Sequence, residues 1–366
     1  MLQFEGEGSG AQVRAIRDWL AWAIESSLLY LRTAGGARLE GQVLVVIRKE
    51  AGAIILAAIS RMWWEKTYPA ALLMAIAQAT LGLVNPGMMT AAKDTASGSF
   101  QRAPLGRTGL EVGRLGVAAG YGVPGSALEW AFDRGVDYIY WGSQRQNSFG
   151  AALKKLRTQR GRFVLVIQSY TRVASLLSWS LERALRALSF DYTDVLLLGM
   201  WNKPLPSRIL DAARGLQAQG LVRFLAISTH KRTLVPQIAA GQDFDVVHFR
   251  YNAAHPGAEK DIFPLLPAAN RPGMVSFTAT SWGQLLGKGL LQGILPGAHR
   301  LPKSERVPTA ADCYRYVLTR PEVDVCLTGP ANAAQMEEAL EALRFGPMSA
   351  DELAWMRRVG RAVSGK

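Results

Sequence analysis

Hydrophobic positions follow one rhythm from about residue 98 to the end of the chain. Short apolar runs that end in polar residues alternate with amphipathic stretches, about eight times. Short, nearly all-apolar strands separated by helices are typical of parallel strands buried on both faces. Eight such units predict a closed (β/α)8 barrel, the TIM-barrel fold. The predicted strands are Leu115–Ala118, Tyr138–Trp141, Phe163–Gln168, Asp194–Leu198, Arg223–Ser228, Asp245–Phe249, Met274–Ala279 and Asp324–Thr328.

Polar and glycine positions mark the ends of the intervening helices. Ser126 is suited to cap the first helix, and Gly135 to stop it. A Gly-turned segment, Pro104–Leu115, precedes the first barrel strand and predicts a short double strand. The predicted helices are Ser126–Arg134, Ser148–Leu156, Leu176–Leu188, Ser207–Gln219, Leu234–Ala239, Glu259–Leu266, Ala310–Leu318, Ala333–Leu343 and Ala350–Val363.

Residues 1–95 do not show this alternation of strands and helices, and we predict that they form a helical extension to the barrel of residues 96–366. Trp19–Arg32 is an amphipathic helix candidate. Tyr68–Val84 is nearly charge-free over about 17 residues, the lower limit for a membrane span. Trp63 and Trp64 precede it, where an interfacial aromatic belt would lie. Three interpretations stay open. The region could associate with a membrane, it could be a small helical module that packs on the main domain or on a protein partner such as another copy of the chain, or it could be a poorly ordered extension.

Composition narrows the class of partner. The formal net charge is +13, and +12 of it lies beyond residue 94, where 33 basic residues face 21 acidic ones. These basic residues form no dense tract and no aromatic platform, so we expect a solvated cationic surface and no nucleic acid partner. Apolar stretches start late, and acidic residues replace a positive leader, so we expect no cleavable signal peptide and a cytoplasmic protein that could reach a membrane through residues 1–95.

Cysteines and histidines, two residue types that commonly bind metals, are few and scattered. Cys313 and Cys326 fall on a predicted helix and a predicted strand, which is no disulfide framework and fits a reducing compartment. The four histidines form no pattern of metal-ligand spacing. We therefore expect no metal site.

Several motifs, in order, are similar to one enzyme family. LGRTGLEVGRLG, DYTDVLLL, GLVRFLAIS, RYN and the Thr328–Pro330 turn followed by Gln335–Glu338 together resemble the aldo-keto reductases, from about residue 100 to 365. Residues Trp282–Leu286, Ala258–Lys260 and Ala311–Tyr314 resemble a divergent bacterial branch of that superfamily. The resemblance implies a barrel that binds NADPH without a Rossmann domain, moves a hydride to a carbonyl of a small-molecule substrate, and uses a tyrosine as acid.

The four catalytic residue types of that family are missing at the matching positions. Tyr140-Trp141-Gly142 stands where the family has Asp-Thr-Ala, and Arg145 lies nearest the place of the catalytic tyrosine. Ser169-Tyr170 replaces Thr-Lys, and Gly199 replaces histidine. An arginine cannot donate a proton near neutral pH.

A rebuilt site is therefore expected. In one interpretation Tyr170 or Tyr140 is the acid, with Arg145 supplying positive charge. In the other, these aromatics with Trp141, Trp201 and the space at Gly199 line a ligand pocket without proton transfer.

The resemblance also implies cofactor contacts. Ser228, Thr229 and His248 match the positions that hold the nicotinamide amide. Trp282, with Ser281 and Gln284, follows the seventh strand and supplies either a stacking face or packing. Gly329, Gln335 and Glu338 match the pyrophosphate and adenosine end, where a helix N-terminus favours anions. No basic residue matches the 2′-phosphate contact, so NAD and NADP both stay open.

We therefore expect an aldo-keto reductase-like, NAD(P)-dependent oxidoreductase that acts on a carbonyl or alcohol with a non-standard site. The alternative is an inactive protein of this fold that binds a nucleotide or aromatic ligand in a regulatory or scaffolding role. A third class, a cofactor-free lyase or isomerase, stays open as well.

Overall fold

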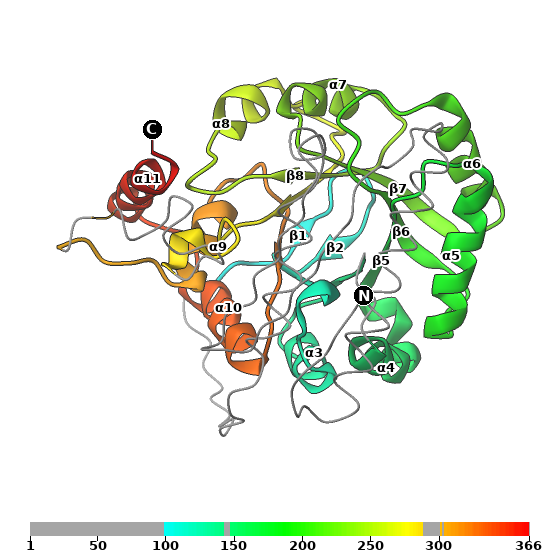
Figure 1. Cartoon of the computed structure of the whole chain (residues 1–366), viewed down its shortest axis with the longest axis horizontal. Coiled ribbons are helices and arrows are strands. Elements are labelled where there is room, and N and C mark those ends of the chain that lie inside the picture. Colours follow the sequence, from blue (N-terminus) through cyan, green and yellow to red (C-terminus); the bar gives the residue numbers. More distant parts are fainter. Residues whose placement is uncertain (1–98, 143–146, 288–300, 302–303, 366) are drawn as a thin grey trace, which may run out of the picture. The chain divides into compact units, whose positions relative to one another are not determined.

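The structure is a computed structural model that describes residues 99–142, 147–287, 301 and 304–365 (Figure 1). The expected helical extension of residues 1–95, with its amphipathic and apolar segments, lies outside the described residues. So does Arg145. In the part of the chain that the structure describes, no helix combines the length and the hydrophobicity that crossing a membrane requires.

Eight parallel strands form a closed barrel, as the apolar rhythm predicted (Figure 1). Each strand pairs with the next along the chain, and the last pairs with the first through Cys326 and Leu115. The register is continuous around the ring, so the carboxyl ends of all strands meet at one mouth. The strands are β3 (Leu115–Ala118), β4 (Tyr138–Trp141), β5 (Val164–Ser169), β6 (Thr193–Leu198), β7 (Val222–Thr229), β8 (Val246–Arg250), β9 (Gly273–Phe277) and β10 (Val325–Thr328).

Helices surround these strands in chain order (Figure 1). One predicted helix, Glu259–Leu266, is instead a short α-helix followed by a 3₁₀ turn. Pro264 lacks a backbone N–H and cannot continue the helical hydrogen bonds. The helices are α3 (Gly125–Phe132), α4 (Asn147–Lys155), α5 (Ser175–Leu188), α6 (Ser207–Ala218), α7 (Val235–Ala240), α8 (Ala258–Asp261), α9 (Ala310–Leu318), α10 (Ala333–Phe345) and α11 (Ala350–Ser364).

The core has two layers because successive strand residues face opposite sides. The larger layer lies between barrel and helices, and the smaller one fills the barrel. On β4, Tyr138 and Tyr140 face the barrel interior, whereas Trp141 packs in the outer layer beside Gly150 of α4. On β8, the same alternation gives Val246, His248 and Arg250 an inward direction.

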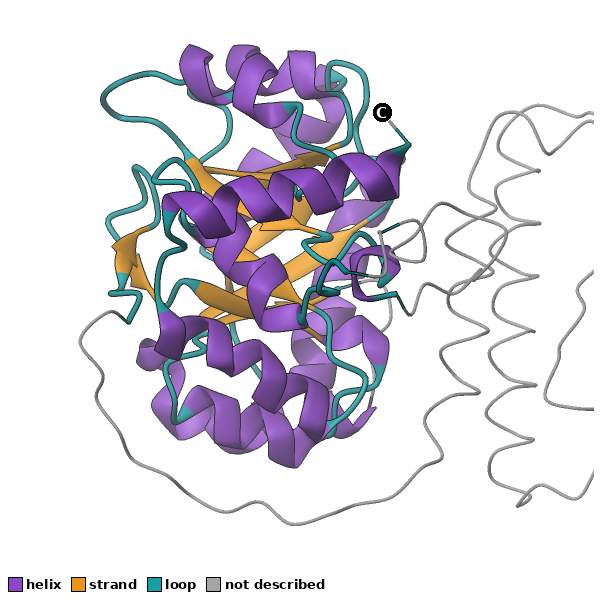
Figure 2. Ribbon diagram, turned by 90° about the vertical axis from the view of Figure 1, so that its left-hand side faces the viewer, coloured by secondary structure: helices purple, strands orange, loops and turns teal. Residues whose placement is uncertain are grey.

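A two-stranded hairpin, β1 (Ala103–Pro104) with β2 (Glu111–Val112), lies at the end of the barrel opposite the mouth (Figure 2). Leu105 and Val112 belong to the interior core, so the hairpin closes that end with apolar side chains. Arg107 extends from the hairpin turn and donates to the carbonyls of Gly241 and Phe244, at 2.7 and 2.6 Å. These bonds attach the hairpin to the loop before β8.

Aspartates at the start of every second strand also hold the closed end together. Each carboxylate accepts a hydrogen bond of 2.8–2.9 Å from a backbone N–H of the preceding strand or its approach. Such bonds satisfy buried amide groups that water cannot reach. The four residues are Asp137, Asp194, Asp245 and Asp324.

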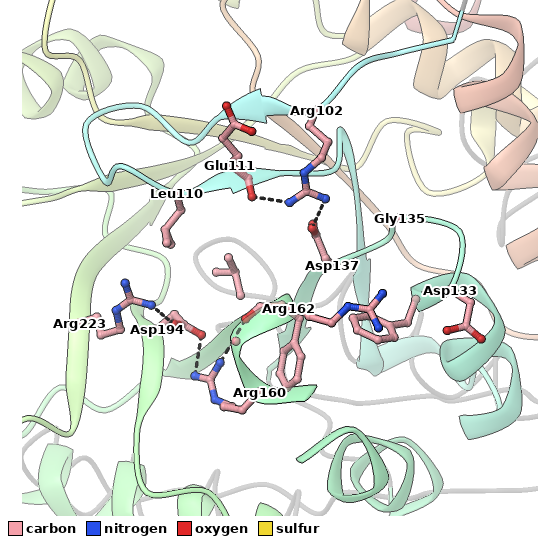
Figure 3. Close-up of a pocket in the computed structure, with 14 residues that line it drawn as sticks. Arg102, Leu110, Glu111, Asp133, Gly135, Asp137, Arg160, Arg162, Asp194 and Arg223 are labelled. Atoms are coloured by element: carbon pink, nitrogen blue, oxygen red, sulfur yellow. Dashed lines mark hydrogen bonds and ion pairs between the residues drawn. The ribbon is translucent and has the colours of Figure 1, made fainter. Parts of the chain in front are cut away.

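A cavity of about 410 Å³ is lined by two of these aspartates, Asp137 and Asp194 (Figure 3). Its buried carboxylates are already paired: Asp137 with Arg102, and Asp194 with both Arg160 and Arg223. Asp194 is 1% exposed. The buried carboxylates that line this cavity are thus neutralised by arginines, which stabilises the closed end. Barrel enzymes carry their active sites at the opposite end, where the strands end.

Candidate active site

A tyrosine and an amide meet inside the mouth. Tyr140 points inward at the end of β4, and its hydroxyl donates to Oε1 of Gln168, which lies on the neighbouring strand β5. Gln168 is 5% exposed. Strand pairing therefore puts a phenol and a carboxamide side by side in a half-buried position, where neither lies in bulk water.

Glycines at three strand ends make room for aromatic rings. A Cβ at Gly142 would lie 2.1 Å from the Tyr140 ring, and one at Gly199 would lie 2.7 Å from the Tyr170 ring. A Cβ at Gly329 would lie 2.5 Å from the ring of Tyr121. Because no real Cβ fits at such distances, the glycines let these rings approach the backbone.

The tyrosine pair Tyr121 and Tyr170 forms one side of the mouth. Burial raises the pKa of Tyr121, and the charge that Tyr170 would carry raises it further. Tyr170 is 46% exposed at the rim. Tyr121 therefore stays protonated at neutral pH, while the side chain of Tyr170 is partly exposed to solvent.

Gly199→Ala is expected to destabilise the protein by about 1–3 kcal/mol, because the added methyl group overlaps Gln168 and Tyr170 and overpacks the mouth. Gly215→Ala is the matched control: nothing lies within 4 Å of a Cβ there, inside α6, so it should stabilise by about 0.5–1 kcal/mol. Urea denaturation of both variants measures the difference. Equal effects would contradict the crowding at Gly199.

Below the mouth, Tyr138 and His248 form a buried hydrogen bond. The Tyr138 hydroxyl lies 2.8 Å from Nε2 of His248. Burial lowers the pKa of His248 to about 3 and raises the pKa of Tyr138 well above 10. Both groups are therefore neutral at pH 7, and His248 acts as a hydrogen-bonding group and not as a cation.

The end of β7 is bound tightly to the loop after β6. The Ser228 hydroxyl accepts a hydrogen bond of 2.8 Å from the backbone amide of Met200. The φ angle of Met200 is 54°, which is unusual for a residue other than glycine. Thr229 donates to Oδ1 of Asn202 at 3.2 Å and accepts from the amide of Lys231 at 3.0 Å. Thr229 is thus engaged on both sides, whereas the Ser228 hydroxyl still has a proton to donate.

A guanidinium, an imidazole and an aromatic ring lie at the ends of three adjacent strands. Arg250 ends β8 and pairs in register with Phe277, which ends β9. His230 directly follows β7, and its ring contacts that of Phe277 edge to face, 5.4 Å between centroids. None of these three residues was predicted from the sequence as a site residue. The inward direction of Arg250 is visible in sequence only once the register of β8 is known.

The β10 side of the mouth is largely capped by the chain itself. Oε1 of Gln335 accepts from the amide of Ala331, and Asn332 caps α10 by accepting from the amide of Gln335. Glu338 accepts from the amide of Ala310 at the start of α9. Gln335 and Glu338 thus each use one oxygen on backbone amides.

The loop after β9 has a strained backbone. Thr278, Ser281 and Trp282 have positive φ angles of 50–61°, a conformation that residues with side chains rarely adopt. Ser281 is buried, and its hydroxyl lies 3.3 Å from Gln284. Trp282 lies five positions beyond the end of β9, so Phe277 and not Trp282 is the aromatic residue at the strand end itself.

The structure brings most of the predicted residues to one mouth, with one correction. Trp141 is 4% exposed and packs against the helices, so it does not line the cup as expected. The reason is alternation: its neighbour Tyr140 takes the inward position. Trp201 does lie at the mouth, where the guanidinium of Arg172 stacks over its ring at 4.0 Å.

A nicotinamide dinucleotide fits the two sides of this mouth differently. Toward β7 and β9, the Ser228 hydroxyl and the Phe277 ring provide a donor and an aromatic face, which suit a nicotinamide ring and its amide. Toward β10, the ring of Tyr121 covers Gly329, and the amides before α10 are capped. The donor set therefore fits the nicotinamide end, and binding of the phosphate end requires Tyr121 or the capping side chains to move.

Comparison with known proteins agrees with this architecture. The structure is similar to the aldo-keto reductase AKR11C1 from Bacillus halodurans in its apo form, with a TM-score of 0.58 and 17% identity over 72% of this chain and 96% of that one. The holo form gives a TM-score of 0.59 and 18% identity over 72% and 97%. At such identity the likeness shows the shared fold. No curated protein matches the sequence significantly.

The sequence itself carries the family assignment. The model of the aldo/keto reductase family matches residues 138–361, well over half of the chain. The match spans the strands β4 to β10 and the mouth that they form. This chain belongs to the aldo/keto reductase family.

Proposed function

We propose that the protein is an NAD(P)-dependent oxidoreductase that interconverts a carbonyl compound and an alcohol, with Tyr140 as its acid. One observation carries this assignment: an inward-facing phenol at the mouth is held by the side-chain amide of Gln168. The family and fold support an oxidoreductase-like function. The identity of the cofactor and the role of Tyr140 are our inference.

The chain's own residues would act as follows. Ser228 and Phe277 would hold and face the nicotinamide, whose reduced form supplies a hydride to the carbonyl carbon. Tyr140 would donate its proton to the carbonyl oxygen as negative charge develops there, and would recover a proton from solvent afterwards. Gln168 holds the phenol in place and can turn its NH₂ group toward the phenolate.

Tyr140 is a better candidate than Tyr170 because of where each hydroxyl lies. Tyr140 is held within the half-buried mouth, whereas Tyr170 is 46% exposed at the rim. Proton transfer from a positioned side chain raises the rate by a factor of about 10²–10⁴. A tyrosine exposed at the rim is less firmly positioned than one held inside the mouth. We therefore infer that Tyr170 shapes the entrance, and that Tyr121 supports it from behind.

Tyr140→Phe is expected to lower kcat/KM by about 100-fold or more, because the ring stays and only the proton donor is lost. Oxidation of NADPH and NADH with a panel of aldehydes and ketones measures turnover. Tyr170→Phe should change it by less than about tenfold. Tyr192→Phe, at the closed end where its ring faces Arg160, is the control and should have no effect.

The alternative is a protein that binds a ligand without turnover. It is favoured by the rings of Tyr121 and Tyr170, which fill the space over Gly329 and Gly199. Tight binding of dinucleotide, followed by fluorescence of Trp201 and Trp282, with no turnover on any carbonyl would support this alternative. Unchanged turnover in the Tyr140→Phe/Tyr170→Phe variant would remove the acid assignment from both tyrosines.

A further inference from the structure

Arg250 lies at the mouth of the barrel and has no counter-ion in the part of the chain that the structure describes. Arg250 is half-buried and follows the inward-facing positions Val246 and His248 along β8. Among the residues that the structure describes, no carboxylate lies within ion-pair distance of it and no acceptor binds its guanidinium. Burial and the charge of Arg232 lower the pKa of Arg250, which reflects the cost of holding this charge.

Other arginines in the described part of the barrel, unlike Arg250, are paired with carboxylates. Arg232 is neutralised by Asp261, whose carboxylate lies 2.7 Å from Nε. At the closed end of the barrel, Arg160 and Arg271 are likewise paired with buried aspartates. Buried charges are paired in proteins because an uncompensated one is costly. Arg250 breaks this pattern at the place where barrel enzymes bind their ligands.

The imidazole of His230 stands beside the guanidinium. Within the described ranges neither of its ring nitrogens forms a hydrogen bond, and its edge-to-face contact with Phe277 orients the ring. Burial lowers the pKa of His230 to about 4, and the charge of Arg250 contributes. The charged group that acts on this imidazole is Arg250 from β8. Arg232, from the turn after β7, acts on Arg250 in its turn and is paired with Asp261 of α8.

We propose that Arg250 and His230 form a carboxylate-binding subsite, and that the substrate is a carbonyl compound that carries a carboxylate next to an apolar or aromatic body. A guanidinium offers two parallel donors to a carboxylate, a neutral imidazole adds a third, and Phe277 provides an apolar face for the body of the ligand. The carbonyl part of this inference rests on the proposed function. The anion subsite does not.

Binding of unreactive ligands to the full chain tests the subsite without turnover. Benzoate is expected to bind at least about tenfold more tightly than benzamide, because only benzoate can pair with Arg250. Arg250→Met should weaken benzoate binding by about 10- to 100-fold and leave benzamide unchanged, with Arg250→Lys in between. Lys231→Met removes one exposed positive charge next to His230 and should have little effect.

A second readout follows the imidazole itself. Bound benzoate neutralises the field of Arg250 and places a negative charge near His230, so the pKa of His230 should rise from about 4. NMR titration of the imidazole, with and without benzoate, measures the shift. Arg250→Met alone should also raise this pKa, and benzoate should then add little.

Further measurements distinguish failure of the carboxylate subsite from failure of the proposed reductase activity. If turnover is found, KM for phenylglyoxylate should lie at least about tenfold below that for its methyl ester, and Arg250→Met should erase the difference. Equal binding of benzoate and benzamide, or equal losses in Arg250→Met and Lys231→Met, would overturn the proposal. So would a loss of NADPH affinity in Arg250→Met with benzoate binding retained, since the anion would then be a dinucleotide phosphate. Selective benzoate binding without any turnover would keep the subsite and reject the reductase.

Discussion

Asp194→Asn is expected to lower the free energy of unfolding by about 3 kcal/mol, the largest stability effect of any single carboxylate at the closed end. Asparagine can still accept the backbone bond from Leu165, but it cannot neutralise Arg160, which is only 13% exposed. Removing one member of a buried ion pair leaves an uncompensated charge and costs about 3–5 kcal/mol. Aromatic rings around Arg160, such as that of Tyr192 at 4.2 Å, recover part of this.

The matched control is Asp243→Asn. Asp243 also pairs with an arginine, Arg214, but the two side chains are 50% and 52% exposed. A surface pair contributes about 0–1 kcal/mol, so this variant should unfold within about 1 kcal/mol of the wild type. Urea denaturation of both variants at pH 7.5 gives the comparison. A loss below about 1 kcal/mol for Asp194→Asn would mean that the network at the closed end is not what stabilises the barrel.

His248→Gln is expected to make folding less sensitive to acid, by about 2 kcal/mol at pH 5. The pKa of His248 is about 3 in the folded protein and 6.5 in the unfolded chain. Because the unfolded chain binds the proton more readily, the free energy of unfolding falls as pH drops below 6.5 and continues to fall toward 3. Glutamine does not titrate and can still bond to the Tyr138 hydroxyl, so stability at pH 7.5 should change little.

Tyr138→Phe separates the titration from the hydrogen bond. It removes the hydroxyl partner and leaves the buried imidazole, so its stability should still fall between pH 7 and 5 as in the wild type. His230, with a pKa of about 4, leaves a residual acid dependence of similar size down to pH 5 in every variant, because its folded pKa also lies below that pH. Parallel unfolding curves at pH 7.5, 6 and 5 measure these slopes. Equal slopes in His248→Gln and the wild type would show that the imidazole is protonated in the folded state.

The strands could be predicted from the sequence because burial on both faces requires short runs of almost only apolar residues. Leu115–Ala118, Tyr138–Trp141 and Ala310–Leu318 have the predicted bounds, and most other elements differ by one or two residues. The exception, the segment after β8, was predicted as one helix from its apolar spacing, although Pro264 ends that helix early. There the missing backbone N–H of proline prevents the helix that the apolar spacing predicts.

The site was harder to predict because this chain lacks the four catalytic residue types of its family at the matching positions. Tyr140, Tyr170, Gly199 and Ser228 do lie at one mouth, since parallel strands bring their carboxyl ends together. Trp141 was assigned to the cup and lies outside it, because a one-residue change along a strand reverses the face. Thr229, His248, Gln335 and Glu338 stay predicted cofactor contacts, each already bonded within the chain.

The sequence by itself determined the barrel, the order of its strands and the end at which their carboxyl termini meet, because the alternation of apolar runs and amphipathic stretches is a local property of the chain. Only the tertiary structure decided which side chains are already satisfied and which are not. That Asp194 neutralises Arg160, while no described residue does the same for Arg250, depends on contacts between strands far apart in sequence. Charge compensation is a property of the space around a group, and no pattern along the chain records it.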